Sequence, residues 1–217
     1  DSQEKPLPAK ITVVQSRAIH EKDINKKSWE HLFDPASGEH FRYSMIDPYN
    51  QKLLHFIEKI SFTQQGNAQL MVRPGDYQVY VSRGPEYDVE VREVSLKTED
   101  TIELSVILNK TVDTDNYISC DFHVHSIHSP DSDVTLFDRV KTLASEGVEY
   151  AVATDHNVIT DYLPWVEFAQ LQDYISTSVG LEVTTFEQGH FNGWPLKYDA
   201  KPIHHGAFYW YGLTPDQ

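Results

Sequence analysis

Imidazole and carboxylate side chains recur at three places in the second half of this chain, and both types bind divalent metals. They are His123, His125, His156, Glu182 and His190. His123 and His125 are separated by one residue, so on a β-strand both imidazoles point to the same face and can bind one ion. A divalent metal lowers the pKa of a bound water toward neutrality and prepares it to attack an ester. The pattern therefore indicates a site for divalent metal ions.

Further carboxylates stand near these histidines in the sequence. The loop over 129–133 contains Asp131 and Asp133, a short distance after the first histidine pair. Asp155 directly precedes His156, where it either binds a metal or accepts the second N–H of a neighbouring imidazole. The simpler alternative is a solvated acidic surface with incidental histidines. The spacing of all three groups along the predicted elements decides between the two.

The elements that must hold these residues alternate between strands and helices. The expected order is a strand over 117–125, a helix opened by Thr135 and ended by Gly147, a strand over 148–153, a helix over about 160–171 and a strand through 179–181. This order predicts a parallel sheet, either open or forming the start of a β/α barrel. Functional side chains in such folds lie at the C-terminal ends of the strands. Each of the three expected strands ends in metal-binding residue types.

The first half of the chain has the pattern of an all-β domain. Strands are expected over 11–14, 77–82, 89–91 and 102–108, where hydrophobic residues alternate with polar ones after turn signals. This alternation is typical of a half-buried antiparallel sheet. We therefore expect two domains, an all-β domain over 1–114 and an α/β domain over 115–217.

Composition excludes several classes of protein. The 217 residues are 40% hydrophobic and 24% charged, which is ordinary globular usage and argues against global disorder. A net charge of -15 opposes non-specific binding to nucleic acid or to an anionic membrane. No apolar stretch approaches the length of a membrane span. The single cysteine, Cys120, excludes an internal disulfide and is expected to be a small buried residue.

The negative charge is concentrated beside the histidines. Residues 120–217 hold 14 acidic and only 4 basic side chains, together with seven of the 11 histidines. Bound divalent cations would offset this charge, so the field that a substrate meets would differ from that of the metal-free chain. The charge distribution is therefore consistent with a site for more than one cation.

Three motifs have the residues of a known metallohydrolase family. They are Asp121-Phe122-His123-Val124-His125-Ser126, Thr154-Asp155-His156-Asn157 and Gly180-Leu181-Glu182. As a set they resemble the first motifs of the polymerase and histidinol phosphatase (PHP) superfamily. The run over 189–192 resembles the branch that includes bacterial carbaryl hydrolase. Upstream, the segments 73–77 and 82–87 are similar to the β-sandwich of carboxypeptidase regulatory domains, which precedes the PHP domain in some such proteins.

The resemblance implies a fold and a set of metals. Residues 115–217 would form the N-terminal half of a distorted (β/α)7 barrel that holds two or three divalent ions, namely Zn, Mn or Fe. His123 and His125 would bind the first metal, Glu182 would bridge the first and second, and His190 would bind the second.

The same resemblance implies a third metal on His156 and an aspartate of the loop. The family has Ser-Asp-Gly where this chain has Ser129-Pro130-Asp131, so Asp131 is our choice and Asp133 the alternative. The later ligands of the family would lie beyond residue 192. We therefore expect the C-terminal part of the PHP domain to be missing from these 217 residues.

The predicted activity is metal-dependent hydrolysis of a small anionic or ester substrate. We expect a phosphoesterase in which a metal-bridging hydroxide is the nucleophile, with His123, His125, Glu182 and His190 as the catalytic ligands. The alternatives are a carboxylic ester, carbamate or amide hydrolase using the same metals, and a non-catalytic metal-containing binding module or inactive fragment. Because the chain starts at Asp1 without an initiator methionine, we also expect an exported protein, periplasmic or extracellular.

Overall fold

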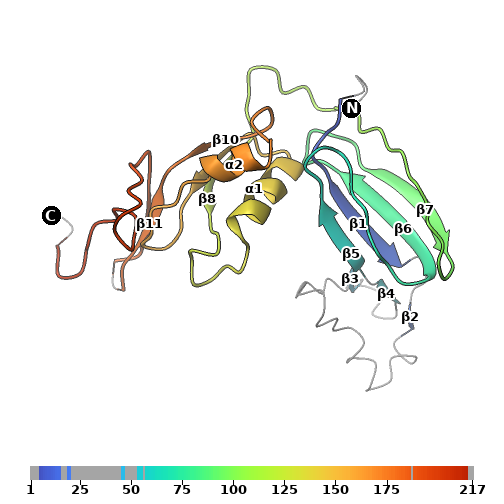
Figure 1. Ribbon diagram of the computed structural model, residues 1–217, viewed down its shortest axis with the longest axis horizontal. Helices are drawn as coiled ribbons and strands as arrows, with labels where there is room; N and C mark the ends of the chain where they lie inside the picture. The colour runs from blue at the N-terminus through green and yellow to red at the C-terminus, as the bar shows by residue number, and fades with distance from the viewer. Residues whose placement is uncertain are drawn as a thin grey trace.

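The structure, a computed structural model, describes residues 5–15, 19–20, 45–46, 53–55, 57–186 and 188–214. The described residues form several β-sheets and two short helices (Figure 1). The largest sheet is antiparallel, with the strand order β5-β1-β6-β7. Its strands are β1 (Lys10–Gln15), β5 (Ile57–Phe62), β6 (Gly75–Ser82) and β7 (Glu90–Leu96). A small sheet contains β2 (Ile19–His20), β4 (Leu53–His55) and β3 (Met45–Ile46).

Alternation along β6 produces the buried face of the large sheet. Tyr77 and Val79 are buried and pack with Val13 of β1, as the expected strands over 11–14 and 77–82 require. The hydroxyl of Tyr77 donates a hydrogen bond of 2.8 Å to the backbone oxygen of Arg73. The β-rich first half is thus confirmed, whereas the sandwich arrangement and the domain boundary after residue 114 stay predictions.

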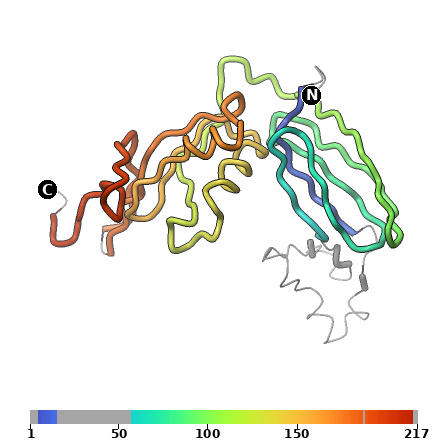
Figure 2. Tube along the Cα trace, viewed as in Figure 1, coloured from blue at the N-terminus to red at the C-terminus, as the bar shows by residue number. Residues whose placement is uncertain are grey.

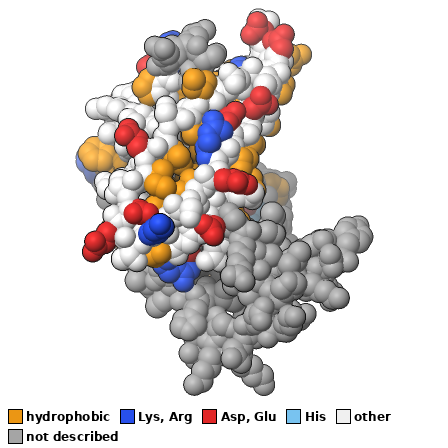
Figure 3. All heavy atoms as spheres, turned by 90° about the vertical axis from the view of Figure 1, so that its right-hand side faces the viewer, with side chains coloured by type: hydrophobic (Ala, Val, Ile, Leu, Met, Phe, Trp, Pro, Cys, Tyr) orange, Lys and Arg blue, Asp and Glu red, His pale blue; other side chains and the backbone are white. Residues whose placement is uncertain are grey.

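The prediction of a strand over residues 102–108 is wrong. Residues 102–108 do not form a strand, and Ile102, Leu104 and Ile107 are exposed. Alternation predicts which side chains share a face but does not supply a partner strand, and the hydrogen-bonded order of the large sheet ends at β7. Figure 3 looks onto the side of the molecule where β7 lies in Figure 1, and hydrophobic side chains are visible there between acidic and basic ones.

An ion pair joins β5 to the turn before β6. Arg73 donates from Nε to Oε1 of Glu58 at 2.8 Å and from its Nη2 atom to Oε2 at 2.6 Å, while its backbone N–H donates to Oε1 at 3.2 Å. These hydrogen bonds from Arg73 lower the pKa of Glu58, and burial of the carboxylate opposes them. The charged form of Glu58 is therefore favoured in the folded state.

Glu58→Gln is expected to lower the free energy of unfolding at neutral pH by about 1 kcal/mol, because it weakens a bidentate pair. The folded pKa of Glu58 lies below its ordinary value, so its stabilisation is fully present above that value and is lost as the pH falls through the lowered one. Urea unfolding of both proteins between neutral and acidic pH measures this. A difference that stays constant with pH contradicts the assignment.

The second half contains a three-stranded parallel sheet with the order β10-β9-β8. Its strands are β8 (Cys120–Val124), β9 (Tyr150–Ala153) and β10 (Ser176–Ser178), and its helices are α1 (Leu136–Ser145) and α2 (Leu163–Phe168). Along the chain the order is β8-α1-β9-α2-β10, as expected. The described residues do not close into a barrel, so a PHP barrel stays a prediction.

Local signals account for α1. Thr135 accepts a hydrogen bond from the backbone N–H of Asp138 at 3.1 Å and donates to the Asp138 carboxylate at 2.8 Å, which caps the first turn. Gly147 follows the last turn with a φ of 77°. The helix buries Val140 and Leu143 against the parallel sheet. Cys120, at the start of β8, is exposed, so the prediction that it is buried is wrong.

The expected strand through 179–181 is interrupted, because residues 179 and 180 lie between two separate strands. β10 ends at Ser178, and a separate hairpin follows, with β11 (Leu181–Thr184) antiparallel to β12 (His190–Gly193). A Cβ atom on Gly180 would lie 2.7 Å from the backbone oxygen of Ala153. Glycine is therefore needed where the chain passes close to the end of β9.

The two halves meet where α1 and α2 lie beside one end of the large sheet (Figures 1 and 2). Lys10 forms an ion pair of 2.8 Å with Glu146, at the end of α1. The hydroxyl of Ser145 donates to the backbone oxygen of Thr63 at 3.0 Å. In the part of the chain that the structure describes, no helix is both long enough and apolar enough to cross a bilayer.

Candidate metal centre

Glu182 is the centre of a cluster of four imidazoles. Its side chain is 2% exposed, and Oε2 lies 3.1 Å from Nε2 of His123, 3.3 Å from Nε2 of His125 and 3.3 Å from Nδ1 of His156. The other oxygen, Oε1, lies 2.9 Å from Nδ1 of His190. A buried carboxylate needs compensating partners, and here all four of these partners are imidazole nitrogens.

The cluster contains three overlapping groups of donor atoms that could each hold a metal ion. They are His123, His125 and Glu182; His125, Asp131 and His156; and His156, Glu182 and His190. Glu182 belongs to two of these groups through its two oxygens. The structure thus brings together all six residues that were assigned as metal ligands from the sequence.

Strand ends and one hairpin place these side chains. His123 lies on β8 and His125 directly follows it, and their rings lie 4.9 Å apart between centroids. His156 follows β9 and forms an isolated parallel bridge with Glu182 of β11. In the hairpin, Thr184 lies opposite His190, so Glu182 and His190 share one face. Backbone hydrogen bonds from Glu182 to Asp155 and from Asn157 to Glu182 hold β11 beside the residues that follow β9.

The imidazole rings form a continuous row. The ring centroids of His125 and His156 lie 4.6 Å apart, and those of His156 and His190 lie 5.2 Å apart. Burial lowers the pKa of His125, and the neighbouring His156 and His123 lower it further, against the opposing effect of two carboxylates. His125 is therefore in its neutral form at neutral pH, which is the form that binds metals.

Asp131 forms one side of the cluster. Its Oδ2 atom lies 3.2 Å from Nε2 of His156, and its Oδ1 atom lies 3.7 Å from Nδ1 of His125. Burial raises the pKa of Asp131, but the attraction of His125 in its protonated form and the hydrogen bond with His156 outweigh it and lower the pKa. The alternative, Asp133, does not belong to any of the three donor groups.

Asp155 lies next to the cluster, but its carboxylate contacts Ser126 and none of the imidazoles. It is fully buried, and its carboxylate accepts hydrogen bonds from the backbone N–H of Ser126 at 2.5 Å and from the Ser126 hydroxyl at 2.7 Å. These contacts hold the chain just after His125. Asp155 therefore matches neither of the two roles considered from the sequence, since it fixes the backbone of the loop that carries the ligands.

Two hydroxyl groups that the sequence did not single out support the imidazoles. The Ser129 hydroxyl lies 2.9 Å from Nδ1 of His125 and accepts a hydrogen bond of 2.9 Å from the backbone N–H of His156. The Thr184 hydroxyl lies 2.5 Å from Nδ1 of His156. Such partners orient metal-binding imidazoles. Their only sequence signal is that each is close to a ligand.

The remaining histidines of the second half lie outside the donor groups. His128 contacts the hydroxyl of Thr160 at 3.1 Å, and its ring lies 5.7 Å from that of His205. Nδ1 of His205 lies 3.0 Å from the backbone oxygen of Ile159. These contacts position the C-terminal segment beside the ends of the strands.

Comparisons with models of protein families, with curated proteins and with solved structures returned no match to this chain. The structure therefore supports a candidate metal centre on its own geometry, built from the ends of β8 and β9 and from the β11–β12 hairpin.

Proposed function

We propose that this chain carries the metal site of a hydrolase, in the first place a phosphoesterase of the PHP type. The observation that carries the proposal is the buried Glu182 carboxylate, whose two oxygens face four imidazole nitrogens at 2.9 to 3.3 Å. In the described part of the chain, no lysine or arginine forms an ion pair with Glu182. A cation between these groups is the natural complement of such an arrangement.

The donor set fits divalent cations. Ligand atoms around a tetrahedral zinc with bonds of about 2.0–2.1 Å lie about 3.3–3.4 Å apart, close to the separations in the cluster. Mixed imidazole and carboxylate donors suit Zn, Mn and Fe. His123, His125 and Glu182 would hold one ion, Glu182 and His190 a second, and His156 and Asp131 a third.

Exposure favours catalysis over a purely structural metal site. The side chains of His123, His190 and Asp131 are 55%, 48% and 53% exposed, although Glu182 is buried. Structural metal sites are closed by protein ligands, whereas catalytic ones keep a position open to water and substrate. This cluster is closed beneath by Glu182 and open on the side of the exposed ligands.

The chain's own residues define what the site would do. Divalent metals supply Lewis-acid chemistry there, which activates water near neutral pH and offsets the charge of an ester. Glu182 fixes the spacing of the imidazoles from below, and Ser129 and Thr184 hold the rings of His125 and His156 in place. Asp131 is the exposed carboxylate at the rim.

Hydrolysis of carboxylic esters, carbamates or amides is the second candidate, and the aromatic surroundings favour it. The indole N–H of Trp210 donates to the side-chain oxygen of Asn157 at 2.9 Å, next to His156. Phe186, which is 91% exposed, lies 5.8 Å from the Trp210 ring between centroids. An apolar ester could contact this aromatic pair while its reacting group reaches the imidazoles.

Metal analysis and two substrates test the proposal. We expect about two or three equivalents of Zn, Mn or Fe per chain and turnover of bis-p-nitrophenyl phosphate that a chelator removes and added metal restores. A p-nitrophenyl ester measured in parallel separates the two candidates. A protein that takes up no metal, or that binds metal and hydrolyses neither substrate, contradicts the proposed function.

A further inference from the structure

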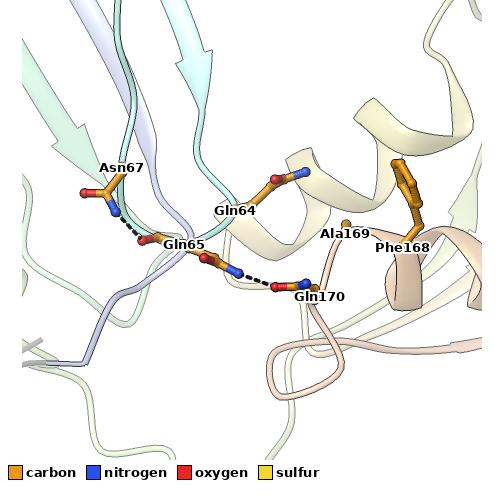
Figure 4. Close-up of a pocket in the computed structure, with 6 residues that line it drawn as sticks. All are labelled: Gln64, Gln65, Asn67, Phe168, Ala169 and Gln170. Atoms are coloured by element: carbon orange, nitrogen blue, oxygen red, sulfur yellow. Dashed lines mark hydrogen bonds between the residues drawn. The ribbon is translucent and has the colours of Figure 1, made fainter.

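A pocket lies away from the imidazole cluster, where the loop after β5 faces the end of α2 (Figure 4). Its volume is about 350 Å³. It is lined by Gln64, Gln65, Asn67, Phe168, Ala169 and Gln170. Four of these six side chains are carboxamides and none is charged, in a chain with a net charge of -15. A neutral, polar lining of this kind does not favour an ionic ligand.

Several carboxamide donors and acceptors in this pocket have no hydrogen-bond partner among the described residues. Gln65 donates from Nε2 to Oε1 of Gln170 at 2.6 Å, and Asn67 donates from Nδ2 to the backbone oxygen of Gln65 at 3.3 Å (Figure 4). Each carboxamide offers two N–H donors and one acceptor oxygen. Within the described residues, the amide of Gln64 has no hydrogen-bond partner, and Oε1 of Gln65 and Nε2 of Gln170 have none either. Unpaired donors and acceptors therefore lie among the residues that line this pocket.

Phe168 adds an apolar surface to this polar lining. Its side chain is 72% exposed. Edge-to-face contacts with Phe137 at 5.7 Å and Trp165 at 6.2 Å hold the ring in position. The ring is thus ordered by its neighbours while much of its surface stays available to a ligand.

We propose that this pocket binds a neutral saccharide. Neighbouring sugar hydroxyls both donate and accept hydrogen bonds, which matches the unpaired donors and acceptors of Gln64, Gln65 and Gln170. The C–H face of a pyranose ring is apolar and packs against an exposed aromatic ring such as Phe168. The volume falls at the lower end of the range of about 300–1,000 Å³ for small-ligand sites, so the pocket fits one or two sugar rings rather than a protein surface.

The saccharide site joins the two halves of the molecule and is independent of the metals. Gln64, Gln65 and Asn67 come from the loop after β5, whereas Phe168 and Gln170 come from the end of α2 and the residues after it. None of these side chains belongs to the metal donor groups. A sugar bound here is therefore expected to bind equally well with and without metal.

Saturation-transfer NMR and calorimetry on the full chain test the proposal, with glucose, galactose, N-acetylglucosamine, maltose and cellobiose as probes. We expect at least one of them to bind, and Phe168→Ala and Gln64→Ala each to weaken its binding about threefold to tenfold. Gln64 makes no described side-chain hydrogen bond, so its replacement leaves the fold intact. Tyr117→Ala is the control, because it removes an exposed aromatic ring that lies outside both the pocket and the metal donor groups.

Each outcome decides the proposal. Weaker binding in both pocket variants, unchanged binding in Tyr117→Ala and unchanged binding after chelation support it. Failure of all five sugars to bind, equal binding in all variants, or loss of sugar binding on chelation contradicts it. The last result would place the sugar at the metal centre, and it would leave the proposed hydrolase untouched.

Discussion

Glu182→Gln is expected to remove most of the bound metal and to lower kcat/KM by more than about 100-fold, beyond the effect usual for residues that only support a ligand. The amide keeps the volume of the side chain but loses the negative charge. It also replaces one of the two oxygens that face the imidazoles with an N–H donor. Two of the three donor groups lose a ligand in this single change.

Metal content, measured with kcat/KM for the hydrolysed nitrophenyl substrate, checks this result. Glu167→Gln is the matched control, since Glu167 is exposed on α2 and outside the donor groups. The control is expected to keep the metal content and activity of the unmodified chain. Full metal loading and unchanged turnover in Glu182→Gln would show that the carboxylate binds no cation.

The ligands could be predicted from the sequence because their spacing follows simple periodicities. His123 and His125 share a face on any strand, and parallel strands bring their C-terminal ends to one edge, which accounts for His156. The position of His190 follows a different rule. It reaches Glu182 because β11 and β12 pair as a hairpin in which His190 lies opposite Thr184.

The supporting hydroxyls could not be predicted in this way. Ser129 contacts both His125 and the backbone of His156, and this requires the loop after β8 to fold back over the end of β9. That path is fixed by Asp155, which accepts two hydrogen bonds from Ser126. The Ser129–His156 and Ser126–Asp155 contacts follow no periodicity, because each connects loop residues that are distant in the sequence.

Alternation also failed where tertiary pairing was decisive. The segment 102–108 alternates as clearly as β6, yet β6 has strands on both sides and 102–108 has none among the described residues. Hydrogen-bonded neighbours, rather than the pattern alone, convert an extended segment into a strand. The β-rich first half was therefore predictable as a class, and its exact strands were not.

Arg83→Met is expected to lower the free energy of unfolding by about 2–4 kcal/mol, because two buried carbonyl groups lose their donor. Arg83 is 6% exposed, and its guanidinium donates to the backbone oxygen of Pro8 at 2.8 Å and to that of Ala144 near the end of α1. The rings of Tyr87 and Tyr174 lie 5.8 and 5.4 Å from the guanidinium carbon. Burial lowers the pKa of Arg83, and both tyrosines oppose this effect.

The position of Arg83 explains why its replacement is expected to lower the free energy of unfolding so strongly. The last turn of α1 contains no basic residue, so Arg83 brings a positive charge from the first half of the chain to the negative end of the helix dipole. Gly84 follows with a φ of 54°, and a Cβ atom there would collide with the backbone oxygen of Glu146. Arg83 and Gly84 together therefore set how closely the large sheet approaches α1.

Urea unfolding at neutral pH, followed by tryptophan fluorescence, measures the effect. Arg83→Lys keeps the charge but lacks the planar fork that reaches two carbonyls, so a smaller loss of about 1–2 kcal/mol is expected. Arg92→Ala is the control, because Arg92 is 42% exposed in its ion pair with Glu90, and a change below about 0.5 kcal/mol is expected. If Arg83→Met unfolds at the same urea concentration as Arg92→Ala, the buried guanidinium does not hold the two halves together.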